Sequence, residues 1–322
     1  MSSYGFEFHI VLAAMAVDAV VGDPPWLYKR VPHPVVVMGS AIEFLERMLN
    51  RAHSTAWRYV AGGLCFVLVT SSALLAAMVI DRVLIEPYEL GWLLEAVIAS
   101  TLLAFRSLYD HVRRVADGLG SSLEEARAAV SHVVGRDPDS LDESGAARAA
   151  IESVAENFSD AVVVPVFWYV IAGLPGLFVY KAINTLDSMI GHQSERQAAF
   201  GFVSAKVDDL VNLIPARIAG LYFVAAASIM PGASGVRALR VMWRDASKHR
   251  SPNAGWQEAA VAGALDLALA GPRIYPDEIV DDAWMGDGES QIGKQAVHAS
   301  LRLYLIAGAL VAVTLLVLAW LS

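Results

Sequence analysis

The chain contains little cysteine and little charge. Cys65 is the only cysteine among 322 residues, which excludes an intramolecular disulfide and a metal cluster held by thiolates. Charged residues make up 18% of the chain, and the eight histidines show no spacing typical of zinc sites. The net charge is −9, and no basic face of the kind that phosphate backbones select is concentrated in the sequence, so nucleic acid is excluded as a partner. No Gly-x-Ser-x-Gly elbow and no dinucleotide-binding fingerprint occurs.

Apolar residues are abundant instead. They make up 56% of the chain, and the mean hydropathy is +0.48, which exceeds the apolar share of soluble domains. Six apolar segments span or nearly span a hydrocarbon core, which takes about 20 residues. They are 8–21, 59–80, 90–108, 161–180, 211–230 and 301–321. The first is short and carries Asp18, which is also compatible with a place at the interface. The composition predicts an all-α, multi-pass integral membrane protein.

The distribution of lysine and arginine predicts the topology. Segments 23–57 and 106–158 are rich in these residues, whereas only Arg82 lies between the second and third apolar segments. The positive-inside rule places both segments in the cytoplasm, together with 232–300, which carries seven more basic residues. The fourth and fifth apolar segments must then both cross or both re-enter. The run 173–176 (Gly-Leu-Pro-Gly) in the fourth, with Pro215 and Arg217 in the fifth, favours discontinuous or re-entrant helices that line a cytoplasm-facing cavity.

Outside the apolar segments, the spacing predicts helices and no strands. Leu123–Val134 and Glu143–Phe158 show apolar residues every three to four positions. Candidate N-caps for the second helix are Ser140, Asp142 and Ser144. The 271–290 region is rich in glycine and proline, as is typical of turns and loops. We therefore expect one membrane domain over residues 1–322, without a separate soluble domain.

Three carboxylates precede the fourth apolar segment. Glu152, Glu156 and Asp160 fall at four-residue steps, so a continuous helix would place all three on one face, where like charges repel. One interpretation is a solvated face on which Arg148 pairs with Glu152. The other is a divalent cation site, since Mg²⁺ takes oxygen ligands from one or two carboxylates and from substrate phosphates. The apolar segment directly after Asp160 favours the cation site, because ionisable groups at a membrane boundary are costly unless they bind something.

A polar stripe follows the fourth apolar segment. Its members recur at three- and four-residue steps and are Lys181, Asn184, Thr185, Ser188 and His192. Polar stripes are usually solvent faces, but such a face would be richer in glutamate and lysine. One lysine among amides and hydroxyls suits the recognition of phosphate or carboxylate groups, and Asp187 beside the stripe is a candidate metal ligand.

A third polar cluster opens the fifth apolar segment. Asp208 and Asp209 lie where that helix is expected to begin, so helix capping and dipole compensation would explain them. Lys206, Asn212 and Arg217 lie nearby, and a role in the same cavity is an equal alternative.

Several motifs together resemble one family. They are Gly22-Asp23-Pro24 with His33-Pro34, the runs 152–169 and 180–191, Asp208-Asp209 with Asn212, Pro215-Ala216-Arg217, and the run 249–255 (His-Arg-Ser-Pro-Asn-Ala-Gly). The chain resembles the adenosylcobinamide-phosphate synthase family of cobalamin biosynthesis, the CobD/CbiB type, from about Asp18 to the last apolar helix. The AmpE type, a related membrane family linked to beta-lactamase regulation, would not be expected to keep all of these motifs.

The resemblance implies an amide ligase of the cytoplasmic membrane whose active site faces the cytoplasm. Members join (R)-1-amino-2-propanol, or its O-phosphate, to the f propionate carboxyl of adenosylcobyric acid with ATP and Mg²⁺. The implied partners are these substrates and the lipid bilayer, and further cobalamin-assembly enzymes and a homo-oligomer stay open. The alternatives are a non-catalytic corrinoid-binding or transport protein and an AmpE-like sensor. Transporters show broken helices at matching positions in two halves of the chain, and the sequence indicates such a break only once, which weighs against transport. The carboxylates that are candidate metal ligands weigh against a sensor.

Residue types suggest roles in such a ligase. A carboxylate must be activated before it accepts an amine, and phosphoryl transfer from ATP to give an acyl phosphate needs mainly positive charge. We hypothesise four groups of residues: Mg²⁺ ligands Glu152, Glu156, Asp160 and Asp187; phosphate-neutralising Lys181 and Lys206; amine-deprotonating Asp208 or Asp209; and substrate-binding Asn157, Asn184, Thr185, Ser188, Asn212, Arg217, His249, Arg250 and Asn253. Trp168, Tyr169 and Tyr180 would take the flat face of the corrin ring or form an interfacial belt.

Overall fold

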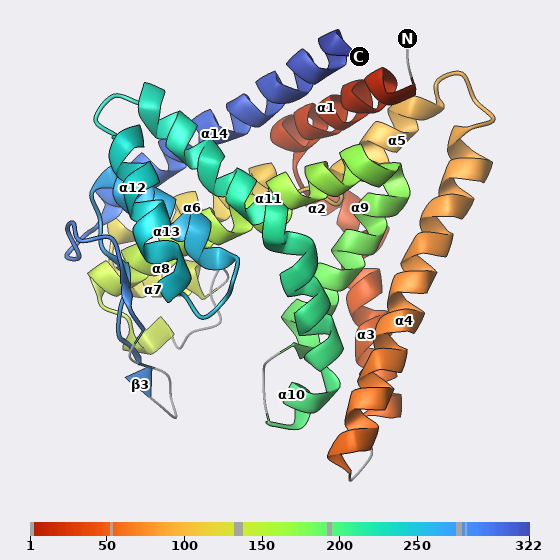
Figure 1. The fold of residues 1–322 in the computed structure, drawn as a ribbon, viewed down its shortest axis with the longest axis horizontal. Coiled ribbons are helices and arrows are strands. Elements are labelled where there is room, and N and C mark those ends of the chain that lie inside the picture. The colour runs from red at the N-terminus through yellow and green to blue at the C-terminus, as the bar shows by residue number, and fades with distance from the viewer. Residues whose placement is uncertain (1–2, 52–53, 132–137, 192–194, 275–278, 281) are drawn as a thin grey trace. The chain divides into compact units, whose positions relative to one another are not determined.

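The computed structural model describes residues 3–51, 54–131, 138–191, 195–274, 279–280 and 282–322. These residues are mostly helical, with four strands of two residues each (Figure 1). The prediction of an all-α fold is confirmed. Clustering of contacts divides the chain into two compact units. Unit 1 comprises residues 1–104, 164–212 and 315–322, and unit 2 comprises residues 105–163 and 213–314.

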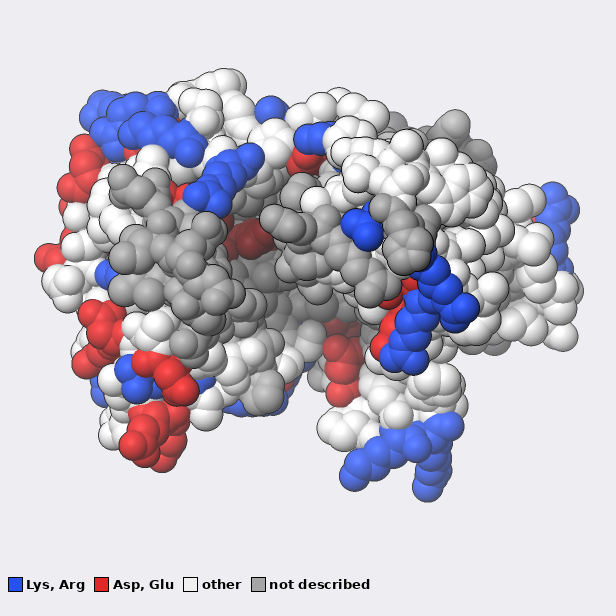
Figure 2. All heavy atoms as spheres, turned by 90° about the horizontal axis from the view of Figure 1, so that it is seen from below, with Lys and Arg blue, Asp and Glu red and all other residues white. Residues whose placement is uncertain are grey.

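Five helical stretches within the described residues are long and apolar enough to cross a membrane. They are Thr55–Ile85, Gly91–Leu119, Glu143–Ile190, Phe202–Ile229 and Lys294–Leu321. The first predicted apolar segment lies in α1 (Ser3–Val21), which is not one of them. The space-filling view shows broad areas without acidic or basic side chains (Figure 2), as expected of lipid-facing surface. The chain is therefore a multi-pass membrane protein.

Unit 1 is built around the long helix α4. Its helices are α1, α2 (Pro25–Tyr28), α3 (Pro34–Leu49), α4 (Thr55–Ile80), the π turn η1 (Asp81–Ile85), α5 (Gly91–Ser100), α9 (Val164–Ile190), α10 (Glu195–Phe200) and the first part of α11 (Phe202–Ile229). Helix α4 packs along α9, and α1 packs along α5. Gly62 permits a close approach, because a Cβ at this position would lie 1.8 Å from the carbonyl oxygen of Phe200.

Unit 2 is built around α8 and α13. Its elements are α6 (Phe105–Leu119), α7 (Leu123–Val130), η2 (Pro138–Ser140), α8 (Glu143–Phe158), η3 (Ser159–Val163), α12 (Gly235–Asp245), η4 (Ala246–Lys248), α13 (Ala254–Leu265), the four strands, and most of α11 and α14 (Lys294–Leu321). Phe158 packs at its centre, with its ring 4.7 Å from that of Phe223 and 5.6 Å from that of Tyr304. Tyr304 also donates a hydrogen bond of 2.8 Å to the carbonyl of Phe105, which fixes α14 to the start of α6.

Three of the four strands lie in the region 271–290, which was predicted to form only turns and loops, and β1 lies directly before it. β1 (Leu269–Ala270) pairs antiparallel with β4 (Trp284–Met285), and β2 (Arg273–Ile274) pairs antiparallel with β3 (Ile279–Val280). The prediction for 271–290 was therefore partly wrong. Strands of two residues are too short to show an alternating pattern, so no sequence signal indicates them.

Local sequence signals set several helix boundaries correctly. Helix α8 has the predicted bounds Glu143–Phe158, and the Asp142 carboxylate caps it by accepting a hydrogen bond of 2.6 Å from the Gly145 N–H. Helix α7 ends at Val130, and residues 132–134 of its predicted range lie outside the described residues.

Helix α9 is broken where the sequence predicted it. Ala172 and Gly173 are non-helical, and Gly173 has φ 60° and ψ −155°, a conformation that favours glycine. Pro175 follows, and a proline within a helix clashes with the carbonyl four residues earlier. The fifth apolar segment differs, because α11 continues as one helix through Pro215.

A π turn joins α8 to α9. Residues Ser159–Val163 form η3, in which each hydrogen bond spans five residues instead of four. The continuous α-helix that would place the three carboxylates on one face is therefore not formed at this point. Asp160 lies within the π turn, so the four-residue spacing no longer places it on the same face as Glu152 and Glu156.

Candidate functional site

Polar side chains from α9 and α11 gather in unit 1. Asp208 is 9% exposed, and its Oδ2 accepts a hydrogen bond of 2.9 Å from the Asn212 amide. The Asn184 side chain lies beside the same carboxylate, and Asp187 is close enough to interact with it electrostatically. The Tyr180 hydroxyl donates to Asn212 Oδ1 over 3.4 Å. We call these five residues the unit 1 cluster.

The unit 1 cluster overturns the capping interpretation of the two aspartates. Helix α11 begins at Phe202, so Asp208 and Asp209 lie beyond its first turn, where capping and dipole effects act. Asp209 pairs with Lys206, whose Nζ lies 3.6 Å from Asp209 Oδ2. The Lys206 side chain is 61% exposed, whereas Asp208 faces the amides. The two neighbouring carboxylates therefore have different surroundings.

The predicted polar stripe on α9 divides between two environments. Asn184 belongs to the unit 1 cluster. The Thr185 hydroxyl donates to the Lys181 carbonyl at 2.7 Å, and the Ser188 hydroxyl donates to the Asn184 carbonyl at 2.9 Å. Lys181 is buried and Ser188 is exposed. His192 lies outside the described residues.

An apolar pocket of about 300 Å³ opens in unit 1 beside the break in α9. It is lined by Leu74, Trp168, Ala172, Pro175, Gly176, Val179, Tyr180, Ile183 and Val211. The expected role of Tyr169 on a corrin-binding or interfacial surface is wrong, because Tyr169 is fully buried and donates a hydrogen bond of 2.6 Å to Glu95 Oε1. Trp168 and Tyr180 do line a pocket, but its volume is at the small end for ligand sites.

The three carboxylates of unit 2 have unequal surroundings. Glu152 is 4% exposed, and its Oε1 accepts a hydrogen bond of 2.8 Å from the Ala270 N–H at the end of β1. Glu156 is exposed and Asp160 is half-buried. The Asn157 amide donates back to the carbonyl and the hydroxyl of Ser153, both over 3.0 Å. Glu152 thus fixes a strand, while Glu156 and Asp160 are the more accessible carboxylates.

Arg148 was expected to pair with Glu152 on a solvated face, but its contacts lie elsewhere. Its guanidinium donates to the Ser290 carbonyl over 2.7 Å and lies 5.6 Å from the centre of the Trp284 ring. Arg148 therefore holds the segment between β4 and α14.

No group of three or more His, Cys, Asp or Glu side chains within the described part of the chain is arranged to hold a metal ion. A magnesium ion would accordingly take one or two protein carboxylates and complete its shell with substrate oxygens and water. Glu156, Asp160 and Asp187 are oxygen donors that are at least partly exposed, and so they fit this role better than Glu152.

A second polar group lies at the start of α13 in unit 2. His249 accepts a hydrogen bond of 3.0 Å from the Ser251 N–H at Nδ1, and its Nε2 lies 3.6 Å from Glu258 Oε1. An accepting Nδ1 leaves the proton of neutral histidine on Nε2. Asn253, Gln257 and Glu258 are all at least 90% buried. Gln257 and Glu258 were not predicted as site residues, although adjacent polar residues in an otherwise apolar helix are a detectable signal.

The two arginines that were predicted to bind substrate have partners within unit 2. Arg250 Nε lies 2.9 Å from Asp282 Oδ1. Arg217 donates to the Leu213 carbonyl, and its guanidinium lies 4.5 Å from the centre of the Trp256 ring. Their predicted contacts with substrate stay predictions.

Asp245 is a buried ionic centre that the sequence did not indicate. Its carboxylate is fully buried and accepts hydrogen bonds from Arg244 at 2.8 and 2.7 Å and from the Gly286 N–H at 2.9 Å, with Lys248 Nζ 2.6 Å away. Burial alone would raise the pKa of Asp245, but these donors outweigh it and hold the pKa well below its usual range. Arg244 also lowers the pKa of Asp287. This centre ties the end of α12 to the segment after β4.

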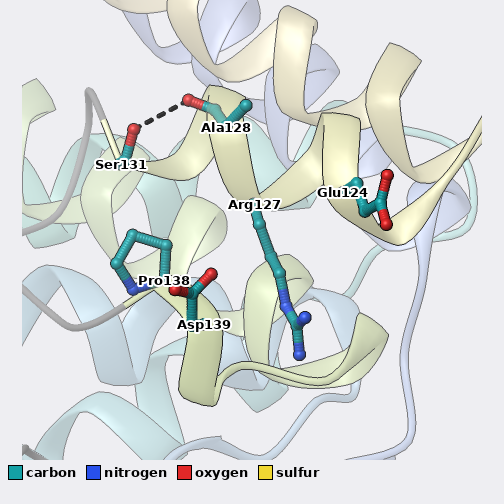
Figure 3. Close-up of a pocket in the computed structure, with 6 residues that line it drawn as sticks. All are labelled: Glu124, Arg127, Ala128, Ser131, Pro138 and Asp139. Carbon is teal, nitrogen blue, oxygen red and sulfur yellow. Dashed lines mark hydrogen bonds between the residues drawn. The ribbon is translucent and has the colours of Figure 1, made fainter.

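A surface pocket of about 400 Å³ lies between α7 and η2 (Figure 3). Its lining residues are Glu124, Arg127, Ala128, Ser131, Pro138 and Asp139. The Arg127 guanidinium is held by the Leu141 carbonyl over 2.8 Å. None of the predicted site residues lines this pocket, so we leave it outside the candidate site.

Comparison with known proteins gives a consistent result. A family model described as CobD/Cbib protein matches residues 11–304. A protein of Sinorhizobium fredii named "Cobalamin biosynthesis protein CobD" is 48% identical over 277 residues, which cover 85% of each chain. Proteins of the same name from a Sinorhizobium species and from Rhizobium meliloti are 50% and 46% identical and cover at least 92% of each chain. No solved structure matches significantly.

Proposed function

Because the chain belongs to the CobD/Cbib family, we propose that it is the ATP-dependent amide ligase that joins (R)-1-amino-2-propanol, or its O-phosphate, to the f propionate carboxyl of adenosylcobyric acid. The names of its relatives support a role in cobalamin biosynthesis. The finer assignment depends on one observation, the buried Asp208 carboxylate and the amides beside it.

Asp208 suits the step in which the amine loses its proton. A buried carboxylate in an apolar helix is costly, so its presence there points to a function. Asn212 orients Asp208 by donating to Oδ2 over 2.9 Å, whereas Asp209 is already paired with Lys206. Asp208 is therefore the better proton acceptor of the two aspartates that were predicted.

The reaction proceeds in two steps. The propionate oxygen takes the γ-phosphoryl group of ATP, which releases ADP and gives an acyl phosphate. The amine nitrogen then attacks the carbonyl carbon, phosphate leaves, and the amine proton passes to Asp208. Lys181 and Lys206 supply positive charge to the phosphate oxygens.

Mg²⁺ would neutralise phosphate charge during the transfer. The carboxylates that fit as ligands are Asp187 within unit 1 and, separately, Glu156 and Asp160 within unit 2. Asn157, Asn184 and Asn253 would orient the substrates. His249 and Arg250 would bind the phosphate of the aminopropanol arm or a corrinoid side chain. Since ATP is cytoplasmic, we propose that the site faces the cytoplasm, in agreement with the positive-inside pattern.

The direct test uses the purified protein in detergent with ATP, Mg²⁺, adenosylcobyric acid and aminopropanol phosphate. The corrinoid product is followed by mass, and nucleotide products are separated as ADP or AMP. Product that requires all four components supports the ligase, and replacing aminopropanol phosphate with aminopropanol identifies the amine substrate. If the corrinoid binds but no product forms, the ligase assignment is wrong and a binding or transport role replaces it.

The role of Asp208 is tested by the pair Asp208→Asn and Asp209→Asn. Loss of a general base lowers kcat by about 10²–10⁴-fold, and we expect this only for Asp208→Asn. Asparagine at position 208 keeps an oxygen that can accept from Asn212, and asparagine at position 209 loses only a pair with a lysine that is 61% exposed. Both variants should therefore extract and melt as the unchanged protein does. Near-normal turnover of Asp208→Asn would exclude Asp208 as the proton acceptor without affecting the ligase assignment.

A further inference from the structure

Helix α12 in unit 2 carries an uncovered apolar stripe. Val236, Leu239 and Trp243 are 73%, 39% and 65% exposed, and their spacing of three and four residues places them on one side of the helix. The opposite side, with Ala238 and Val241, is buried, and α12 packs extensively on α13. The exposed side of α12 is therefore a second apolar face with no cover among the described residues.

The apolar stripe continues an apolar surface of α11. Helix α12 folds back along the second half of α11, because Gly235 lies against Val224 and Ser228, while Met242 lies against Gly220 (Figure 1). Leu221 and Ile229 on this part of α11 are 48% and 65% exposed. Helix α11 is one of the stretches able to cross a membrane. The α12 stripe therefore adjoins a surface already suited to lipid.

Basic side chains border the stripe on the side away from α11. At 100° per residue, Gly235 and Met242 lie on one side of the stripe, and Arg237, Arg240 and Arg244 lie on the other. Arg237 is bound to Asp266 and Arg244 to Asp245 and Asp287. Arg240 is exposed, and none of the described residues forms an ion pair with it. The sequence shows no concentrated basic face, because these arginines come together only when the helix forms.

Two tryptophans lie at the end of the stripe that Trp243 forms. The Trp243 and Trp256 rings pack edge to face with centroids 5.1 Å apart, and the Arg217 guanidinium lies over Trp256. Tryptophan and arginine are typical of the boundary between hydrocarbon and lipid headgroups, so this end of α12 has the composition of a helix at that boundary.

We propose that α12 lies beside α11 at the membrane boundary and presents Val236, Leu239 and Trp243 to the bilayer, with Arg240 at the level of the phospholipid phosphates. The occupant of the stripe is the membrane that α11 enters, because the two apolar surfaces are continuous. This places the polar start of α13, with His249 and Glu258, one helix layer from lipid.

Spin labelling tests the proposal on the full chain in lipid nanodiscs. Single cysteines are introduced at Val236 and Leu239, with one at Glu124 on α7 as an exposed control; Cys65 is buried and its background labelling is measured in the unchanged protein. Collision rates are recorded with oxygen, which concentrates in hydrocarbon, and with a water-soluble nickel chelate. We expect a higher oxygen-to-nickel ratio at positions 236 and 239 than at 124. Equal ratios, or protection from both reagents as under a protein partner, would overturn the proposal.

A second measurement needs no added cysteine. Tryptophan fluorescence is compared between the unchanged protein and Trp243→Phe in bilayers with and without brominated acyl chains. If Trp243 is in contact with lipid, the variant loses part of the quenched signal. An unchanged quenched signal would show that Trp243 lies outside the bilayer and would contradict the proposal.

Discussion

Replacing Asp245 with asparagine should destabilise unit 2 strongly. The Asp245 carboxylate is fully buried and takes four contacts from Arg244, Lys248 and Gly286, all at or below 2.9 Å. Asparagine has nearly the same shape as aspartate but no charge. Its NH₂ group cannot accept a hydrogen bond, so some of the N–H donors around position 245 would lose their acceptor. The substitution therefore isolates the charge from the packing.

The magnitude follows from the burial of the partners. Removing one partner of a buried ion pair costs about 3–5 kcal/mol. The Arg244 and Lys248 side chains are 42% and 44% exposed, so both can regain water, and we discount the loss to about 2–4 kcal/mol. For a unit of this size the melting temperature should fall by roughly 5–15 °C.

The assay is thermal unfolding in detergent, with Asp287→Asn as the matched control. Asp287 also accepts from Arg244 over 2.9 Å, but its side chain is 69% exposed. An exposed pair contributes less than about 1 kcal/mol, so the control should melt within roughly 4 °C of the unchanged protein. If Asp245→Asn melted no lower than Asp287→Asn, the buried charge would not be stabilising and the reasoning would fail.

Other predictions follow from single contacts. Gly62→Ala should prevent α4 from packing on α10 and lower the yield of folded protein, since its Cβ would lie 1.8 Å from a backbone oxygen. The adjacent Gly63→Ala should be tolerated, because the atom nearest to its Cβ would be 3.8 Å away. Similar yields of folded protein from the two variants would refute this prediction. Tyr169→Phe removes the donor to Glu95 Oε1 and should cost about 1–3 kcal/mol in thermal unfolding, and an unchanged melting temperature would contradict it. Because the pKa of Asp245 is lowered in the folded protein, its contribution to the free energy of unfolding is complete above its pKa in the unfolded chain, about 3.9. This contribution is lost as the pH falls through the pKa that Asp245 has in the folded protein. The difference in melting temperature from Asp245→Asn should thus stay constant from pH 8 to about 5 and shrink below about 4, and a loss already near pH 6 would point to another group.

Features with a local cause could be predicted from the sequence. The bounds of α8 follow from apolar spacing and an aspartate cap, and the break in α9 follows from Gly173 and Pro175. The π turn at Ser159–Val163 could not be predicted, because no residue type marks the extra residue in such a turn.

The candidate site shows the same limit. The polar stripe on α9 could be recognised from its spacing in the sequence. Which of its residues join the unit 1 cluster depends on Asp208, which comes from another helix. Glu152 was predicted as a metal ligand, yet one of its oxygens is bound to Ala270, 118 residues later in the chain. Asp245 likewise depends on Gly286, 41 residues away. Contacts between distant residues leave no periodic trace in a single sequence.

The interleaving of the two units has a consequence for biogenesis. Helices α4 and α9 pack together in unit 1, but residues 105–163, which belong to unit 2, are made between them. At a synthesis rate of about 5–20 residues per second, α4 leaves the ribosome several seconds before its partner exists. The exposed apolar side of α4 can face lipid at this stage, but the surface around Gly62 has no packing partner until α10 has been synthesised. Assembly within the bilayer therefore has to follow insertion, and the nascent chain is most vulnerable to membrane proteases during that interval.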